Sequence, residues 1–198
     1  ISESMKNLSN YKVKSKKILL RVDLNVPVVN GVIVDNSRIK SIKLTIDILK
    51  KQNNKIFLIS HFGRPKGKVD QKYSLKFLCS ILENELEIDN IIFLKNFDND
   101  QIQLKLKKMK TTDICLFENI RFNLSEEIND LSFIKKICEN FDIFINDAFS
   151  ASHRKHASIV GPPNFLPSLA GESLINEIKN INIFFDNPKN PNLAIIGG

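Results

Sequence analysis

Arginines stand at positions of this sequence where they could together bind a small anion. Three of them directly follow short apolar segments, and Arg38 opens the segment after the first one; the four are Arg38, Arg64, Arg121 and Arg154. Most of the other basic residues are lysines. Arginine presents planar, paired donors that fit phosphate and carboxylate oxygens, whereas lysine acts as a point charge. This selectivity favours a small ligand with several negative charges over the simpler explanation that the chain is merely rich in basic residues.

Two residues with acceptor groups follow the first apolar segment. Asp23 and Asn25 lie two positions apart in RVDLNVPV, so their side chains would point to one face. The carboxylate accepts hydrogen bonds and the amide both donates and accepts, which suits a ligand hydroxyl beside an anion. An Asx turn before Pro27 would explain the same pair without any ligand. The sequence leaves both interpretations open.

Histidines and a glycine complete the set of candidate site residues. In SHFGRPKGK, His61 precedes Gly63 and Pro65, which could form a tight loop that brings backbone close to a ligand, or simply a turn. His153 and His156 could suggest a metal pair, but no third ligand supports it. A structural or phosphate-contacting histidine is favoured, and we predict no metal site in this chain. Neither a G-x-x-x-x-G-K-[ST] loop nor G-x-G-x-x-G occurs, so no nucleotide phosphate cradle is predicted.

Composition limits the class of protein. The net charge is +7, and hydrophobic residues make up 42% of the 198 positions, as in ordinary globular domains. No apolar run is long enough for a membrane span, and the polar start ISESMKNLSN lacks a signal-peptide core. The cysteines are widely spaced and lie in apolar stretches, which predicts buried thiols in a reduced, cytoplasmic compartment; they are Cys79, Cys115 and Cys138.

The elements that would position these residues follow an alternating pattern. Short, continuously apolar runs predict strands buried on both faces of a parallel sheet, at 17–22, 55–60, 90–94, 113–117, 142–146 and 192–196. Helical spacing of apolar residues appears between them, at 37–50, 74–86 (with Ser74 as N-cap), 100–109 and 130–141. The pattern predicts an α/β fold: a Rossmann-like, doubly wound parallel sheet with helices on both faces. Ligands bind such sheets at the carboxyl ends of the strands, where the candidate residues lie.

The last part of the chain differs from the rest. A helix is predicted over about 169–185, DNPKNPN then breaks the chain, and LAIIGG reads as a buried strand without sheet neighbours. We therefore expect three parts: a ligand-binding domain over 1–168, an interdomain helix over 169–187, and over 188–198 the start of a truncated second domain.

The segments RVDLNVPV, NSRIK, SHFGRP, FENIRF, NDAFSASHRKHAS and LAIIGG, in this order and spacing, resemble the phosphoglycerate kinase family over nearly the whole chain. The resemblance implies the amino-terminal half of such an enzyme, which binds 3-phosphoglycerate or 1,3-bisphosphoglycerate. It also implies that residues 188–198 begin a truncated nucleotide-binding domain, and that Mg²⁺ with ATP or ADP is bound by this missing carboxy-terminal domain. The full-length protein would be a cytoplasmic monomer of glycolysis and gluconeogenesis. Binding of membrane or nucleic acid is not expected.

The resemblance assigns a role to each candidate residue. Asp23 and Asn25 should hold the hydroxyl and carboxyl end of the glycerate, and Arg38 should lie nearest the acyl phosphate as the catalytic charge. The non-transferred phosphate should be held by His61, Arg64, Arg121 and Arg154. The supporting residues should be Arg21, behind Asp23, together with Gly63 and His156.

The chain departs from the family at a few points. Phe62 stands where the family often has Leu, AGESLINEI matches the interdomain helix only loosely, and family members are about twice as long. The family's carboxy-terminal tail folds back onto this domain, so its loss should expose apolar surface. We expect the chain alone to bind 3-phosphoglycerate weakly and to turn over nothing. The rival hypotheses are a stand-alone anion-binding module and, from the net charge alone, a nucleic-acid binder.

Overall fold

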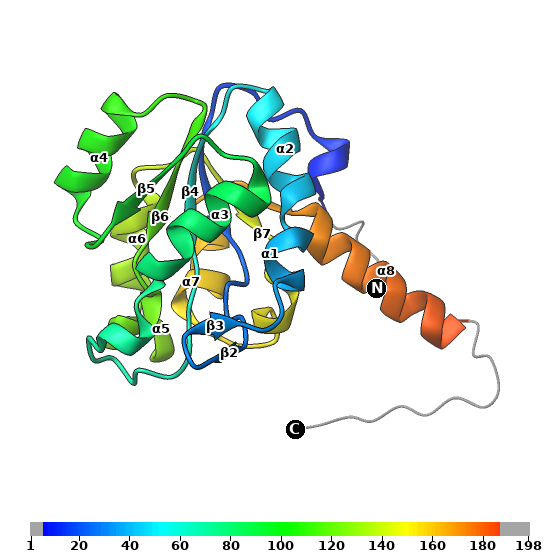
Figure 1. The fold of residues 1–198 in the computed structure, drawn as a ribbon. Coiled ribbons are helices and arrows are strands. Elements are labelled where there is room, and N and C mark those ends of the chain that lie inside the picture. The colour runs from blue at the N-terminus through cyan, green and yellow to red at the C-terminus, as the bar shows by residue number, and fades with distance from the viewer. Residues whose placement is uncertain (1–5, 187–198) are drawn as a thin grey trace.

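A six-stranded parallel sheet forms the centre of the computed structural model, which describes residues 6–186 (Figure 1). Its strand order is β5-β6-β4-β1-β7-β8, and every neighbouring pair is parallel. The strands are β1 (Lys17–Arg21), β4 (Lys55–Ile59), β5 (Asn90–Leu94), β6 (Asp113–Phe117), β7 (Ile143–Asn146) and β8 (Ser168–Ala170).

Helices cover both faces of the sheet, because the strands bury apolar side chains on both sides. Ile18 and Leu20 of β1 pack toward α1 (Ser37–Ser41), α2 (Lys43–Lys51) and α3 (Cys79–Leu86), which form one layer. Leu19 packs on the opposite face, with α4 (Asn99–Lys108) and α6 (Leu131–Cys138). Each such side chain contributes about 1.5–3 kcal/mol relative to exposure. The predicted doubly wound α/β fold is confirmed.

Five of the predicted strands match the observed ones within one residue at each end. The sixth strand of the sheet, β8, was not predicted, and the predicted strand at 192–196 lies outside the described residues. β8 extends the edge beside β7, where Phe144 pairs with Ser168. The isolated bridge between Asn7 and Ala170 then covers part of that edge.

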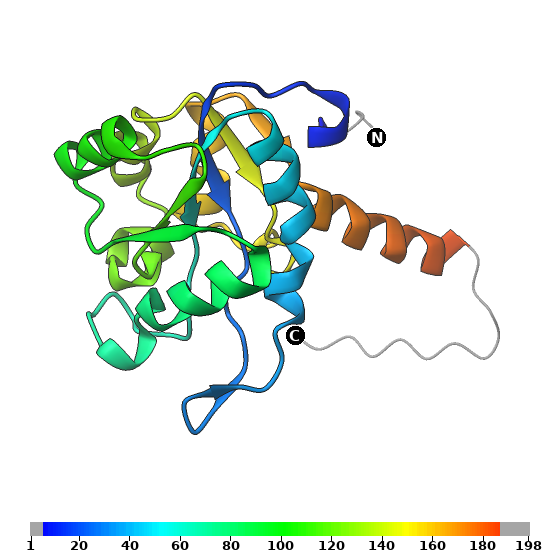
Figure 2. The same cartoon turned by 45° about the horizontal axis from the view of Figure 1, so that its top comes forward.

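The predicted helices are present, with changes at their ends. The segment predicted as one helix over 37–50 forms α1 and α2, which are separated at Ile42. Ser74 does act as an N-cap, accepting from the Lys76 N–H, but the helix it opens is η3 (Leu75–Leu78), a 3₁₀ helix that continues into α3. The last helix, α8 (Glu172–Asp186), runs out from the body of the molecule (Figures 1 and 2). The division at 168/169 and 187/188 stays a prediction.

Short elements lie among the connections. Beyond β1, the hairpin of β2 (Val28–Val29) and β3 (Val32–Ile33) turns at Asn30 and Gly31, both with positive φ, and projects from the molecule (Figure 2). The remaining short elements are η1 (Leu8–Asn10), η2 (Gln71–Tyr73), η4 (Ile120–Phe122), α5 (Leu124–Glu127), η5 (Phe149–Ala151), α7 (Ala157–Val160) and η6 (Pro162–Asn164).

The connections after β1 and β7 leave the sheet in opposite directions. β1 and β7 are neighbours in the sheet. From β1 the chain goes on to β4, on the side of β1 away from β7, whereas from β7 it goes on to β8, on the side of β7 away from β1. Loops that diverge in this way leave a crevice at the carboxyl ends of two neighbouring strands, which is where open α/β sheets bind their ligands. The strand order therefore places a crevice beside the residues that follow β1 and β7.

Candidate functional site

A basic hollow of about 300 Å³ lies at the carboxyl edge of the sheet. It is lined by Asn25, Arg38, His61, Gly63, Arg64, Arg121, Ser150, Ala151 and Arg154. These residues follow β1, β4, β6 and β7, or, in the case of Arg38, open α1. The four arginines that the sequence singled out therefore converge on one hollow. Asp23 is not among the lining residues but lies directly behind three of them, Asn25, Arg38 and Ser150.

The arginines of this hollow differ in how far the protein already satisfies them. Arg38, whose side chain is 44% exposed, forms an ion pair with Asp23 at 3.3 Å and donates to the Asn25 carbonyl at 2.7 Å. Arg64 and Arg154 are exposed, and within residues 6–186 their guanidinium groups form neither a hydrogen bond nor an ion pair. Two guanidinium groups thus face the hollow with all their donors free for a ligand.

Arg121 is more constrained. It is only 4% exposed and donates from Nη1 to the Gly63 carbonyl at 3.0 Å, while its buried Nε has no partner. Burial lowers the pKa of Arg121, and the nearby charge of Arg154 lowers it further. Because an arginine stays protonated in proteins, this shift signals crowded positive charge that an anion would relieve.

His61 is held as a neutral donor. Arg21, fully buried, donates from Nη2 to His61 Nδ1 at 2.9 Å. A guanidinium can only donate, so Nδ1 must accept and the proton of the neutral ring lies on Nε2. Burial lowers the pKa of His61 well below its usual range, and the positive charges of Arg21 and Arg121 lower it further. His61 can therefore donate to an anion without carrying charge.

Arg21 forms its hydrogen bonds with groups other than Asp23. They go to His61 and to the carbonyls of Val22 and Ile59, at 3.0 and 3.3 Å. Burial lowers the pKa of Arg21, and the carboxylates of Glu126 and, to a smaller extent, Asp23 oppose that shift. Arg21 therefore interacts with Asp23 through charge, while its guanidinium donates to His61 and to the end of β4.

The buried carboxylate of Glu126 offsets part of the positive charge of Arg21 and Arg121. Glu126 of α5 is fully buried and accepts from the backbone N–H of Ser158 at 2.8 Å and from its hydroxyl at 2.5 Å. Next to it, His156 has a buried Nδ1 without a partner, and its pKa is lowered by burial and by the charges of Arg121 and Arg154. Glu126 thus connects the loop after β6 to the loop after β7, and His156 lies beside the hollow without lining it.

The structure shows the turn that was one interpretation of the Asp23–Asn25 pair, and it places Asn25 in the wall of the hollow. Asp23 Oδ1 accepts from the Asn25 N–H at 3.0 Å, which is the Asx-type bond expected of a turn. The same oxygen accepts from Arg38, and Oδ2 accepts from the Ser150 hydroxyl. Asn25 lines the hollow, and its Oδ1 accepts from the Gly63 N–H at 2.9 Å.

The loop after β4 depends on Gly63 and Asn119. Gly63 has φ +60°, and a Cβ there would lie 2.4 Å from the Tyr73 ring, so only glycine fits. Asn119, fully buried, donates to the carbonyls of Phe62 and Tyr73 at 2.7 and 2.9 Å. Its Oδ1 accepts from the Arg121 N–H at 3.1 Å. The amide therefore fixes the loops that carry Arg64 and Arg121 relative to each other.

Sequence reasoning missed Ser150 and Ala151 as lining residues. The motif NDAFSASHRKHAS drew attention to its histidines and arginine, whereas Ser150 is one of three serines in it. Its position after β7 was the available signal. Its contact with Asp23, however, joins residues 127 positions apart and is not encoded locally.

Other candidate chemistry is limited in the part of the chain that the structure describes. There, no group of three or more His, Cys, Asp or Glu residues is placed to hold a metal ion, and no helix is long and apolar enough to cross a membrane. Cys115 and Cys138 are buried free thiols whose pKa burial raises to about 12, and Cys79 is half-buried. Such thiols are unreactive.

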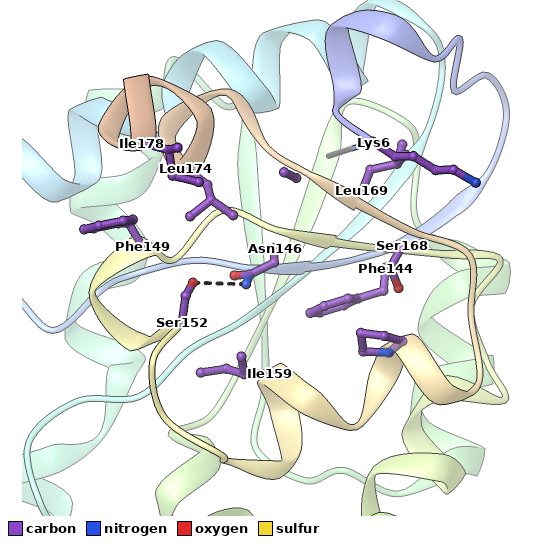
Figure 3. A pocket seen from close by; sticks show the side chains of 12 residues that line it. Lys6, Phe144, Asn146, Phe149, Ser152, Ile159, Ser168, Leu169, Leu174 and Ile178 are labelled. Carbon is purple, nitrogen blue, oxygen red and sulfur yellow. Dashed lines mark hydrogen bonds between the residues drawn. The ribbon is translucent and has the colours of Figure 1, made fainter. Parts of the chain in front are cut away.

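A larger, mostly apolar hollow of about 940 Å³ lies where β7 and β8 meet η5 and α8 (Figure 3). Phe149, Leu174 and Ile178 surround it from η5 and α8, and Ile159 lies below them. Asn146 and Ser152, joined by a hydrogen bond of 3.2 Å, supply part of its polar lining. Among the described residues, Lys6 is the one charged residue that lines it, whereas four arginines line the basic hollow.

Fold and site together define a doubly wound α/β domain with a basic hollow at the carboxyl edge of its sheet, where the connections after β1 and β7 diverge. The chain belongs to the phosphoglycerate kinase family, whose family model matches residues 8–198. It is 40% identical to the phosphoglycerate kinase of Coprothermobacter proteolyticus over 98% of this chain and 49% of that protein. It is 42% identical to that of Orientia tsutsugamushi (strain Ikeda), over 98% of this chain and 48% of that protein.

Solved structures agree with this assignment. Phosphoglycerate kinase from Coxiella burnetii matches with a TM-score of 0.79 and 31% identity, over 94% of this chain and 46% of that one. The enzyme from Pyrococcus horikoshii matches with a TM-score of 0.83 and 26% identity, over 94% of this chain and 47% of that one. The chain thus spans about half the length of the relatives that it matches.

Proposed function

We propose that this chain is the phosphoglycerate-binding half of a phosphoglycerate kinase. The full enzyme moves a phosphoryl group between 1,3-bisphosphoglycerate with ADP and 3-phosphoglycerate with ATP. The observation that carries the proposal is the convergence of Arg38, Arg64, Arg121 and Arg154 on one small hollow at the carboxyl edge of the sheet. Family membership supplies the identity of the anion, which the hollow alone does not.

Each lining residue receives a role that fits its contacts. Arg64 and Arg154, with unpaired guanidinium groups, would bind the non-transferred phosphate together with Arg121 and the Nε2–H of His61. The carboxylate end of the ligand would lie near Asn25, with Asp23 behind it. Gly63 would let the backbone of its loop approach the ligand closely.

Arg38 would carry the catalytic charge. It is half-exposed at the rim of the hollow and held there by Asp23 and the Asn25 carbonyl. Phosphoryl transfer depends on positioning and on stabilising the charge of the transferred group, and little covalent chemistry falls to the protein. A guanidinium that is fixed but still accessible suits that task.

The nucleotide and its Mg²⁺ would be bound outside the described residues. Residues 6–186 contain no cluster of acidic, histidine or cysteine side chains that fits a metal ion, and the sequence contains no phosphate-binding glycine motif. We therefore assign ATP, ADP and Mg²⁺ to a further domain and derive no step from them. The complete enzyme would be a cytoplasmic monomer, and this chain alone would not turn over substrate.

Calorimetric titration with 3-phosphoglycerate tests the proposal. The chain should give a saturable heat with weak affinity, and Arg38→Ala should weaken binding at least tenfold, which is about 1.4 kcal/mol or more. Lys108→Ala removes a positive charge from the last residue of α4, just before the chain enters the amino end of β6, and should leave the affinity within about twofold.

Two outcomes would count against the proposal in different ways. Absence of any heat on the unmodified chain would remove the phosphoglycerate site itself. Equal losses in Arg38→Ala and Lys108→Ala would mean that bulk charge attracts the ligand and that Arg38 has been given the wrong role. A stand-alone anion-binding module would be supported instead if the protein in its natural length bound the ligand but showed no Mg²⁺- and ATP-dependent turnover.

A further inference from the structure

Glu126 is a fully buried carboxylate that lies outside the basic hollow, between two of the loops that line it. It belongs to α5 and follows Arg121 in the loop after β6. Both of its oxygens accept from Ser158 of α7, which follows Arg154 in the loop after β7. Within residues 6–186 the carboxylate forms no ion pair. Glu126 is therefore fixed beside the arginine-bearing loops without being bonded to any arginine.

The positive charge next to Glu126 is only partly offset by the protein. Arg21 is fully buried and Arg121 is 4% exposed, and the buried Nε of each has no hydrogen-bond partner. Burial lowers the pKa of both arginines, and the carboxylate of Glu126 opposes that effect in each, joined at Arg121 by the exposed Glu127. Like charges that are held together away from water repel strongly, and an opposite charge nearby reduces this cost. Glu126 thus stabilises the cluster of buried guanidinium groups through its charge.

A ligand phosphate would offset the same charges from inside the hollow, where Arg121 and Arg154 belong to the lining. Two anions that stabilise the same cations do not contribute additively, because each leaves less unbalanced positive charge for the other. The two anions also repel each other. Negative charge at Glu126 should therefore stabilise the empty site and oppose the binding of an anion.

We propose that Glu126 is an internal counter-charge that stabilises the arginine cluster of the empty site and thereby lowers its affinity for an anionic ligand. No proton is transferred and no bond is broken. The inference rests on the proposed function, because it requires an anion in the hollow, and it adds a residue that tunes the affinity from outside the hollow. A purely structural Glu126 would have the opposite consequence, since its loss would loosen the loops of Arg121 and Arg154 and weaken binding.

The test measures stability and affinity on the same variant. Glu126→Gln removes the charge but keeps the size of the side chain and an acceptor for the Ser158 N–H. It should lower the urea midpoint of the ligand-free chain by about 1 M, because the buried guanidinium groups lose their counter-charge. It should nevertheless strengthen the binding of 3-phosphoglycerate about threefold to tenfold in calorimetry. Because a ligand stabilises the folded state according to its affinity, saturating 3-phosphoglycerate should recover about half of the lost midpoint.

Two further variants separate the charge from the hydrogen bonds and from the net charge. Ser158→Ala removes one hydrogen bond to Glu126 and keeps its charge, so it should lower the urea midpoint without strengthening binding. Glu139→Gln removes an exposed negative charge at the end of α6, shortly before the amino end of β7. It should leave the affinity for 3-phosphoglycerate within about twofold, because the charge is distant and screened.

The outcomes separate the inference from the proposed function. Weaker or unchanged binding in Glu126→Gln would overturn the counter-charge role while leaving the phosphoglycerate site intact. If this variant does not fold alone, 3-phosphoglycerate should fold it more effectively than NaCl of the same ionic strength, as followed by circular dichroism. A variant that stays unfolded with the ligand would also contradict the proposal. If the unmodified chain bound no 3-phosphoglycerate, the proposed function would fail, and this inference with it.

Discussion

At the scale of single residues, the site divides its positive charges into two kinds. Arg21 and Arg121 are buried and donate hydrogen bonds within the protein, to His61 and to backbone carbonyls. Arg64 and Arg154 are exposed and unpaired within the described residues. The buried pair builds a rigid, electropositive floor, and the exposed pair remains free to form paired bonds with an anion. Preorganised donors of this kind lose little freedom on binding.

His61 gives the most specific prediction at this scale. Its Nδ1 accepts from Arg21, and burial with neighbouring arginines holds its pKa below the usual range. We therefore expect the neutral Nε2–H form to persist from about pH 8 down to about pH 5, where an ordinary histidine would charge. Long-range ¹H–¹⁵N correlation spectra of the ring nitrogens would measure this, with His61→Gln identifying the signal by its loss. Conversion of that signal to a doubly protonated ring by pH 5 would contradict the assignment.

At the scale of elements, the start of α8 depends on one buried carboxyl. Asp147 follows β7, is 2% exposed, and accepts from the Leu174 N–H at 3.0 Å through Oδ1. Its Oδ2 is buried without a partner, and a Cβ on Gly171 would lie 2.4 Å from its Oδ1. Burial raises the pKa of Asp147 to about 6, although the bond from Leu174 acts in the opposite direction. The helix is thus fixed to the sheet by a group that resists ionisation.

This arrangement links stability to pH. Because the pKa is higher in the folded state than the ordinary value of 3.8, the stabilisation is complete below about pH 4 and is lost as pH rises through about 6. Asp147→Asn cannot ionise and keeps an acceptor for Leu174. The stability of the variant relative to the unmodified chain should therefore rise by up to about 3 kcal/mol between pH 4 and pH 7. Urea unfolding at both pH values measures the difference, and parallel pH dependences of the two chains would rule the mechanism out.

Much of this arrangement could be predicted from the sequence, because buried parallel strands carry a strong local signal. Five strands were located from continuous apolar runs, and the residues after them met at one edge because parallel strands end there together. β8 was missed because Ser168–Ala170 is short, follows a proline and carries no apolar run. Its strand conformation is imposed by pairing with β7. The β2–β3 hairpin was missed although Asn30-Gly31 is a strong turn signal.

Side-chain partners were harder to predict than positions. Arg21 was predicted as a support for Asp23, and its hydrogen bond to His61, in the loop after β4, was not predicted, because side-chain direction at a sheet edge depends on tertiary neighbours. The same limit hid Ser150, whose partner Asp23 follows the neighbouring strand β1 but lies 127 positions away in the sequence. The types of residue at strand ends were informative, whereas the pairs that they form were not encoded locally.

At the scale of the whole molecule, two surfaces point to different partners. The basic hollow suits an anion, whereas the hollow of Figure 3 is lined mostly by apolar side chains such as Phe149, Leu174 and Ile178. The chain spans about half the length of the curated relatives that it matches. The apolar hollow is therefore the surface that we expect to pack against further protein, whereas the basic hollow is the surface that we expect to bind the small ligand.

The net charge of +7 is the remaining question, because it is the one feature that a nucleic-acid binder would share. A small ligand in a compact site should lose only about threefold to tenfold in affinity between about 0.05 and 0.5 M NaCl, since buried pairs are screened little. A protein that contacts many phosphates of a nucleic acid would lose several orders of magnitude in affinity over a similar range.

Calorimetry with 3-phosphoglycerate and anisotropy of a labelled single-stranded DNA, at the same salt concentrations, compare the two salt dependences directly. We expect a shallow slope for 3-phosphoglycerate, and for DNA at most a weak binding that is lost at moderate salt. DNA binding that survives at physiological salt and is indifferent to 3-phosphoglycerate, combined with no heat from the metabolite, would instead assign the charge to nucleic acid. The expected result follows from geometry, because the arginines are gathered in one hollow whose lining residues include no Phe, Tyr or Trp side chain on which bases could stack.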